Sequence, residues 1–169
     1  CTFALDNASF YEFGQENKTF RSNVEQWPLM VQQALHVAKE SAKKFGLDPN
    51  LYNGVHANLF NTGSVGLNPH FDKERSMVSG APIFSFTLLS DESLPRFFSI
   101  YTLDKEKLYD ILLPHGCMLV MRGQMQQWFK HGVEPMKPPK MYKNLARINL
   151  TVRAFKVESS ESYESVTEL

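Results

Sequence analysis

The chain has few cysteines, no excess charge of either sign and no long apolar run. With only Cys1 and Cys117 among 169 residues, it can build neither a disulfide framework nor a cysteine-based zinc site. There are 18 basic residues (lysine and arginine) and 18 acidic residues (aspartate and glutamate), so the net charge gives no general attraction to nucleic acid. A zero net charge does not exclude a local basic rim. No apolar run reaches eighteen residues, which excludes a transmembrane helix.

These absences favour an intracellular protein of one domain that does not enter membranes, without indicating a compartment. The first residue is Cys1 and not methionine. We therefore take the chain as a segment of a longer protein, whose missing part could carry a targeting signal.

The hydrophobic pattern predicts one helix followed by many short strands. Over residues 24–45 apolar side chains recur at helical spacing, and Gly46 follows where a helix would end. Residues 1–22 suggest only short strands or loops. From residue 50 the period changes to two, with strands expected at 55–60, 82–89, 96–101, 108–113, 117–122, 127–133 and 146–155. This order predicts a mainly β fold with a flanking helix, arranged as a sandwich or jelly roll.

His70 and Asp72 are candidate metal ligands. They lie two residues apart, so in an extended segment both side chains project to the same side and can chelate one ion. The preceding Asn68-Pro69 favours extended backbone. Two imidazoles and one carboxylate can hold one face of Fe(II) and leave the opposite positions open. The ordinary alternative is a surface histidine that happens to lie beside an aspartate.

The third ligand must come from elsewhere in the chain, and four histidines compete for the position. His36 lies on the predicted helix, His56 lies before a turn, and His115 follows Pro114 in a predicted loop. His131 lies in a predicted strand that precedes the strand with two arginines. This order selects His131.

The predicted strand at 146–155 has polar residues on one face and apolar residues on the other. The polar face holds Arg147, Asn149, Thr151 and Arg153. A solvated amphipathic strand is the alternative, but such a strand would use lysine, glutamate or aspartate, and none is present. The two arginines lie about 20 Å apart along the strand. We expect one to bind the far carboxylate of a dicarboxylate and the other to lie near the metal.

Five motifs in order make residues 52–155 resemble the AlkB family of Fe(II)/2-oxoglutarate-dependent nucleic-acid dioxygenases. The family has Asn-x-Tyr-x-x-Gly, His-x-Asp-x-acid, Pro-Ile-x-Ser-x-Ser-Leu, a strand with the last metal ligand, and a closing arginine strand. The corresponding segments are Asn58-Leu-Phe60-Asn-Thr-Gly63, His70-Phe-Asp72-Lys-Glu74, Pro82-Ile-Phe-Ser-Phe-Thr-Leu88, Met121-Arg-Gly123 through His131, and Arg147-x-Asn149-x-Thr151-x-Arg153.

The resemblance implies a double-stranded β-helix core and oxidative demethylation of N-alkylated bases, in DNA repair or RNA demethylation. It implies Fe(II) on His70, Asp72 and His131, which would be the catalytic centre. It also implies 2-oxoglutarate on Asn58, Arg147, Asn149 and Arg153, with Arg147 at the distal carboxylate and Arg153 near the metal. Glu74 matches an acidic position that meets the methylated base in relatives. Phe60 departs from the family's tyrosine, which removes one hydroxyl and about tenfold in co-substrate affinity.

The same resemblance divides the chain into three parts. Residues 1–50 would be an N-terminal extension with one amphipathic helix and a candidate substrate lid, although they do not align with the family's lid. Residues 51–157 would be the jelly-roll dioxygenase core, and residues 158–169 an acidic, disordered tail.

Nucleic acid, DNA or RNA, is the expected substrate, and the protein is expected to be a monomer. Lysines 130, 137, 140 and 143 could contact phosphates, with an ordinary solvated loop as the alternative. Trp27, Tyr52, Trp128 and Phe129 could stack on bases, but core packing is the better expectation for each. Two other functions stay open, namely the same chemistry on a protein or small molecule and a non-catalytic jelly-roll binding module.

Overall fold

The computed structural model describes residues 1–5, 19–72, 76–138 and 142–157. The helices are α1 (Leu29–Lys44) and α2 (Met125–Trp128), with 3-10 turns at Val24–Gln26 and Pro49–Leu51. The strands are β1 (Thr2–Ala4), β2 (Thr19–Arg21), β3 (Gly54–Phe60), β4 (Leu67–His70), β5 (Ile83–Leu89), β6 (Arg96–Tyr101), β7 (Lys107–Leu113), β8 (Met118–Met121), β9 (Lys130–Val133) and β10 (Arg147–Arg153). Within these ranges, no helix has the length and apolar character that a membrane span needs.

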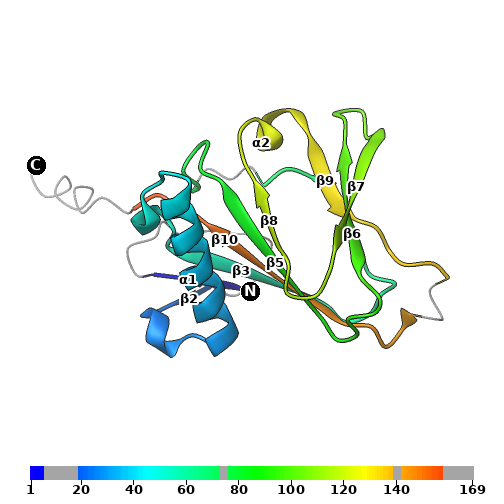
Figure 1. Ribbon diagram of the computed structural model, residues 1–169, viewed down its shortest axis with the longest axis horizontal. Coiled ribbons are helices and arrows are strands. Elements are labelled where there is room, and N and C mark those ends of the chain that lie inside the picture. The colour runs from blue at the N-terminus through cyan, green and yellow to red at the C-terminus, as the bar shows by residue number, and fades with distance from the viewer. Residues whose placement is uncertain (6–18, 73–75, 139–141, 158–169) are drawn as a thin grey trace, which may run out of the picture.

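The strands form two antiparallel layers that face each other (Figure 1). The larger sheet has the order β2-β1-β3-β10-β5-β8, and the smaller has the order β4-β9-β6-β7. Among the strand pairs of the described residues, the β1–β2 pair at the edge is the parallel one. This arrangement confirms the predicted jelly roll. Strands from residues 1–22 join the large sheet beside β3, while the division of the chain at residue 50 stays a prediction.

Helix α1 covers the outer face of the larger sheet (Figure 1). Its apolar stripe packs into a core that includes strand residues of β3, β5 and β10, namely Val55, Phe84, Leu150 and Val152. The helix ends as predicted, because Gly46 adopts φ +72°. The N–H groups of Gly46 and Leu47 then donate to the carbonyls of Lys43 and Ala42, which caps the last turn.

Strand β10 is at the centre of the larger sheet and sends its polar face into the sandwich. Asn149 lies opposite Asn58 and Thr87 on the two neighbouring strands. Thr151 lies in the same way between His56 and Ser85. The predicted alternation of this strand is therefore correct, but its polar face is buried and not solvated. Buried polar side chains need hydrogen-bond partners, and here Asn149 bonds to both Arg147 and Thr151.

The strand predicted at 127–133 begins only at Lys130. Residues 125–128 form the single helical turn α2, in which the N–H groups of Gln127 and Trp128 donate to the carbonyl of Gln124. The preceding Gly123 has φ +63°, which turns the chain out of β8 into this helix. A short apolar run does not distinguish a strand from one helical turn, which explains the error.

Gly132 permits the close approach of β4 and β9. A Cβ atom at this position would lie 2.5 Å from the carbonyl oxygen of Leu67 and 3.2 Å from the nitrogen of Pro69. We expect Gly132→Ala to push the strands apart and to lower the free energy of unfolding by about 1–3 kcal/mol, as measured by urea denaturation. It should also weaken metal binding, because His131 is the adjacent residue. Gly46→Ala is the control variant. Its backbone has φ +72°, which strains an alanine, but an added Cβ would meet no atom within 4 Å, so this variant should lower stability without changing metal affinity. Equal metal affinity in both variants would contradict this account.

Candidate active site

His70, Asp72 and His131 converge between the two sheets. His70 ends β4 and lies directly opposite His131 on β9, with ring centroids 4.4 Å apart. Asp72 follows two residues later, and its two oxygens lie 3.5 Å from His70 Nε2 and 3.6 Å from His131 Nε2. The candidate ligand atoms all lie within 4.8 Å of one another. The sequence prediction that these distant residues meet is therefore confirmed.

The ring of His70 is oriented for metal binding through Nε2. Its Nδ1–H donates to the carbonyl of Asn68 at 2.9 Å, which leaves the Nε2 lone pair facing Asp72. Burial acts to lower the pKa of His70, but hydrogen bonds to Asp72 and to Asn68 raise it above its ordinary value. A nearby carboxylate thus favours a cation at this point, either a proton or a metal ion.

His131 lies deeper and is held by packing. Its ring stacks on Phe98 with centroids 5.1 Å apart and an interplanar angle of 16°. Burial lowers the pKa of His131 to about 4, so the imidazole is neutral at physiological pH, as a metal ligand must be. Its Nδ1 is buried with no hydrogen-bond partner among the described residues.

Asp72 is fixed from two directions. Arg153 Nη2 donates to its Oδ1 at 2.8 Å, and its backbone N–H donates to Gln126 Oε1 at 2.8 Å. Burial acts to raise the pKa of Asp72, but the hydrogen bond with His70 and the charge of Arg153 hold it well below its usual range. The ionised carboxylate, together with two imidazole nitrogens, is a donor set that fits Fe(II).

Sequence reasoning did not identify Gln126, because a glutamine between two predicted strands carries no motif. Gln126→Leu removes the acceptor for the Asp72 N–H, and we expect it to weaken metal affinity by about 10- to 100-fold. The change is measured by titration with Co(II), whose absorption reports coordination. Gln127→Leu is the matched control, since Gln127 is exposed and the acceptor for the Asp72 N–H is Gln126. Equal affinities in the two variants would show that Gln126 does not position Asp72.

Arg147 lies at the other end of β10, six residues from Arg153. Its Nη2 donates to Thr87 Oγ1 at 3.0 Å and to Asn149 Oδ1 at 2.7 Å, and its guanidinium lies 5.1 Å from the ring centroid of Phe60. Burial lowers the pKa of Arg147 to about 10, and the nearby charge of Arg96 adds to this effect. Within the described ranges no carboxylate pairs with it. A buried guanidinium without an acid is suited to an anionic ligand.

The amides of Asn58 and Asn149 are placed differently. Asn149 accepts from Arg147 and from Ser85 Oγ, and its Nδ2 donates to Thr151 Oγ1, so all its contacts are internal. Within the described part of the chain, Asn58 bonds through its Oδ1, which lies 3.0 Å from His56 Nε2. The roles of both residues as co-substrate contacts stay predictions. The Nδ2 of Asn149 already donates to Thr151, whereas the bond of Asn58 to His56 uses its oxygen, so the Asn58 Nδ2 is the better placed to donate to a ligand.

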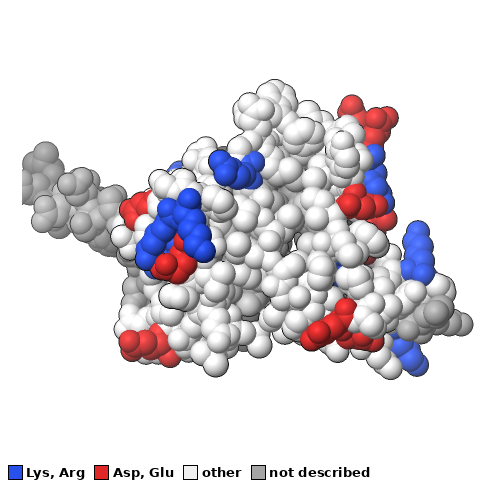
Figure 2. Space-filling view, in the orientation of Figure 1, with Lys and Arg blue, Asp and Glu red and all other residues white. Residues whose placement is uncertain are grey.

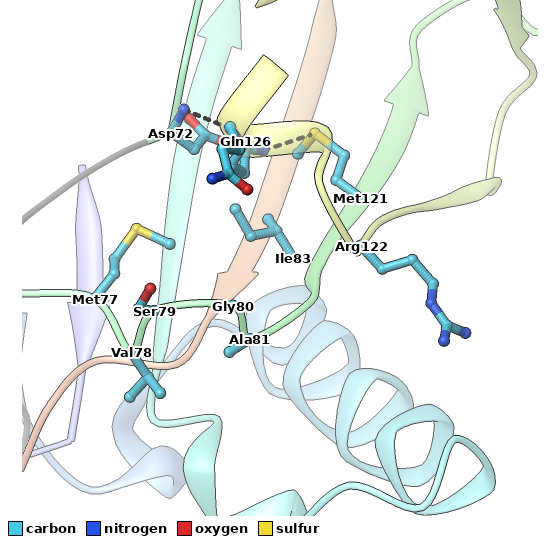
Figure 3. A pocket seen from close by; sticks show the side chains of 12 residues that line it. Asp72, Met77, Val78, Ser79, Gly80, Ala81, Ile83, Met121, Arg122 and Gln126 are labelled. Atoms are coloured by element: carbon cyan, nitrogen blue, oxygen red, sulfur yellow. Dashed lines mark hydrogen bonds between the residues drawn. The ribbon is translucent and has the colours of Figure 1, made fainter. Parts of the chain in front are cut away.

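Two cavities meet at the candidate metal site. A polar cleft inside the sandwich is lined by the three candidate ligands and by Asn58, Arg147, Asn149, Thr151 and Arg153. A larger pocket of about 500 Å³ lies outside, and Asp72 and Met121 line both. Figure 3 shows Asp72 and Gln126 at one end of this pocket, with Met77, Val78 and Ser79 across from them and Arg122 directed away.

Other predicted residues lie elsewhere. Glu74, Lys140 and the tail at 158–169 fall outside the described residues. Trp27 and Tyr52 are buried in the core, as expected, whereas Trp128 and Phe129 are exposed, contrary to the expectation of core packing. Lys137 and Lys143 are exposed, and Lys130 donates to the carbonyl of Leu103.

Two solved structures share a distant likeness with the chain. A Pseudomonas putida prolyl-4-hydroxylase is 14% identical, with a TM-score of 0.41, over 63% of this chain and 54% of that chain. Pseudomonas aeruginosa AlgX is 15% identical, with a TM-score of 0.33, over 59% of this chain and 26% of that chain. The chain thus spans about half the length of the first and a quarter of the second. No curated protein matches the sequence.

A sequence model of a protein family matches a larger part of the chain than these two structures do. The sequence model of the 2OG-Fe(II) oxygenase superfamily matches residues 10–153, which include all three candidate metal ligands and both arginines of β10. The chain therefore belongs to the 2OG-Fe(II) oxygenase superfamily, the dioxygenases that use Fe(II) and 2-oxoglutarate.

Proposed function

We propose that this chain is an AlkB-like dioxygenase domain that removes N-alkyl groups from bases in DNA or RNA. The five motifs that resemble the AlkB family support this substrate class. The observation that carries the proposal is the pocket of about 500 Å³ that reaches Asp72 from outside the sandwich. Its volume suits one nucleobase or nucleotide, and its position would bring an alkyl group to the metal.

In this proposal His70, Asp72 and His131 hold Fe(II), and Arg147 binds the distal carboxylate of 2-oxoglutarate. When bound, the metal and co-substrate supply the oxidising power for hydroxylation of an N-methyl group, which then leaves as formaldehyde. The protein orients the co-substrate through polar side chains of β3 and β10 that line the cleft. Arg153 serves by holding Asp72 ionised and in place.

The lining of the outer pocket favours a base over an acidic or highly charged substrate. Met77, Val78, Ile83 and Met121 supply apolar contacts, while Ser79 and Gln127 supply hydrogen-bonding groups. The base would enter unpaired, either flipped from a duplex or from a single strand. The chain has no net charge, and the face shown in Figure 2 has basic and acidic groups interspersed. We therefore expect contacts to few phosphates and a shallow salt dependence of binding.

The test incubates the chain with Fe(II), 2-oxoglutarate and oligonucleotides that carry 1-methyladenine or 3-methylcytosine, as DNA and as RNA. We expect succinate and formaldehyde in equal amounts, with loss of one methylene mass from the oligonucleotide. Unmethylated oligonucleotides of the same sequence are the control. Succinate that appears at the same rate with methylated and unmethylated strands, or only with a peptide or small molecule, would refute the nucleic-acid assignment.

A further inference from the structure

We propose that His56, held by Thr2 of β1, is a positioning residue that orients the Asn58 amide toward the co-substrate. This inference rests on the proposed function, because it takes 2-oxoglutarate as the ligand of the polar cleft. It adds a hydrogen-bonded chain from the N-terminal strand to the site. No motif in the sequence indicates it, since Thr2 and His56 are 54 residues apart.

The three side chains form a continuous row across two strands. Thr2 lies directly opposite His56 where β1 pairs with β3. Thr2 Oγ1 lies 2.8 Å from His56 Nδ1, and His56 Nε2 lies 3.0 Å from Asn58 Oδ1. His56 and Asn58 are two residues apart on β3, so both project from the same face of the sheet into the sandwich. Thr2 is 1% exposed and His56 4% exposed, so water does not compete for these bonds.

The direction of each hydrogen bond follows from the chemistry of the groups. Burial lowers the pKa of His56 to about 4, so the ring is neutral and carries one N–H. The Asn58 Oδ1 can only accept, which places the proton of His56 on Nε2. Nδ1 is then an acceptor, and the Thr2 hydroxyl donates to it. Thr2 thereby fixes the tautomer of His56.

This direction decides what Asn58 presents to the cleft. With its Oδ1 engaged by His56, the amide directs its Nδ2 donor away from the histidine, and no other described residue accepts from it. Asn58 lines the same cleft as Asp72 and Arg147. A carboxylate offers only acceptors, so a fixed N–H donor matches 2-oxoglutarate, whereas a rotated amide would present an oxygen and repel it.

The experiment measures binding of 2-oxoglutarate by calorimetry with Mn(II) in place of Fe(II), together with kcat and KM for the Fe(II) enzyme. We expect His56→Leu to raise the Kd and KM by about tenfold, and Thr2→Val by about threefold, with kcat changed less than about twofold. His56→Gln, which retains an N–H donor at a similar reach, should recover most of the affinity. Thermal melting of each variant reports whether it folds.

A double-mutant cycle separates positioning from a general structural role. If His56 acts through Asn58, then His56→Leu should add almost nothing in an Asn58→Ala background, where the amide is already absent. Additive losses, or a His56→Leu variant that binds 2-oxoglutarate as tightly as the parent, would overturn the inference. Failure of the parent itself to bind 2-oxoglutarate would instead contradict the proposed function, so the two failures are distinguishable.

Discussion

Replacement of His70 by alanine is expected to abolish turnover of 2-oxoglutarate while the domain stays folded. The substitution removes one of three candidate ligand atoms that lie within 4.8 Å of one another. The side chain is 32% exposed and belongs to the last residue of β4, so its loss leaves no large internal cavity. We expect succinate production to fall by about a thousandfold or more, because a site with two ligands does not retain Fe(II).

The matched control for this variant is His115→Ala. His115 is 37% exposed and lies 3.7 Å from the carboxylate of Glu92, so it resembles His70 in exposure and in its acidic neighbour. It lies outside both cavities that meet at Asp72. We expect its turnover to stay within about twofold of the parent chain. A His70→Ala protein that still consumes 2-oxoglutarate at the rate of this control would exclude the assigned metal site.

Arg147→Met is expected to raise the KM for 2-oxoglutarate by about a hundredfold or more without destabilising the domain. A buried guanidinium–carboxylate contact is worth about 2–5 kcal/mol to binding when one partner is truncated. The pKa of Arg147, lowered by burial to about 10, indicates that the folded protein holds this charge at a net cost. We therefore expect the free energy of unfolding to change by less than about 1 kcal/mol, as measured by urea denaturation.

Arg153→Met provides the contrast, since the two arginines come from the same strand and have similar burial. Arg153 forms a salt bridge with Asp72, so its loss removes a buried partner and should destabilise the domain by about 3–5 kcal/mol. The pair of variants thus separates a ligand-binding arginine from one that supports the metal site. If Arg147→Met unfolds as readily as Arg153→Met and binds 2-oxoglutarate normally, Arg147 is structural.

Much of the metal site could be predicted because the motif and the strand pattern carry independent information. The two-residue spacing of His70 and Asp72 is a local property of extended chain, and it survives in the structure although β4 ends at His70. The choice of His131 over three other histidines used only the order of elements. The structure adds the reason, which is that β4 and β9 pair with the two histidines in register.

Other contacts could not be predicted because they depend on tertiary placement. The helical turn α2 places Gln126 against the backbone of Asp72, and nothing in a glutamine-rich segment indicates that contact. His56 was considered only as a competing ligand, whereas its partners come from β1 and from its own strand. The burial of the polar face of β10 also follows from the second sheet lying over it.

The pairing of β4 with β9 has a consequence for how long the protein would retain a bound ion. Strand β4 is at the edge of the smaller sheet, and β9 is its one neighbour among the described strands. An ion bound to His70 and His131 would link these two strands, so separation of β4 from β9 would remove one of its ligands. Opening of β4 therefore shortens the lifetime of the loaded site, and amide hydrogen exchange in β4 would measure how often this opening occurs.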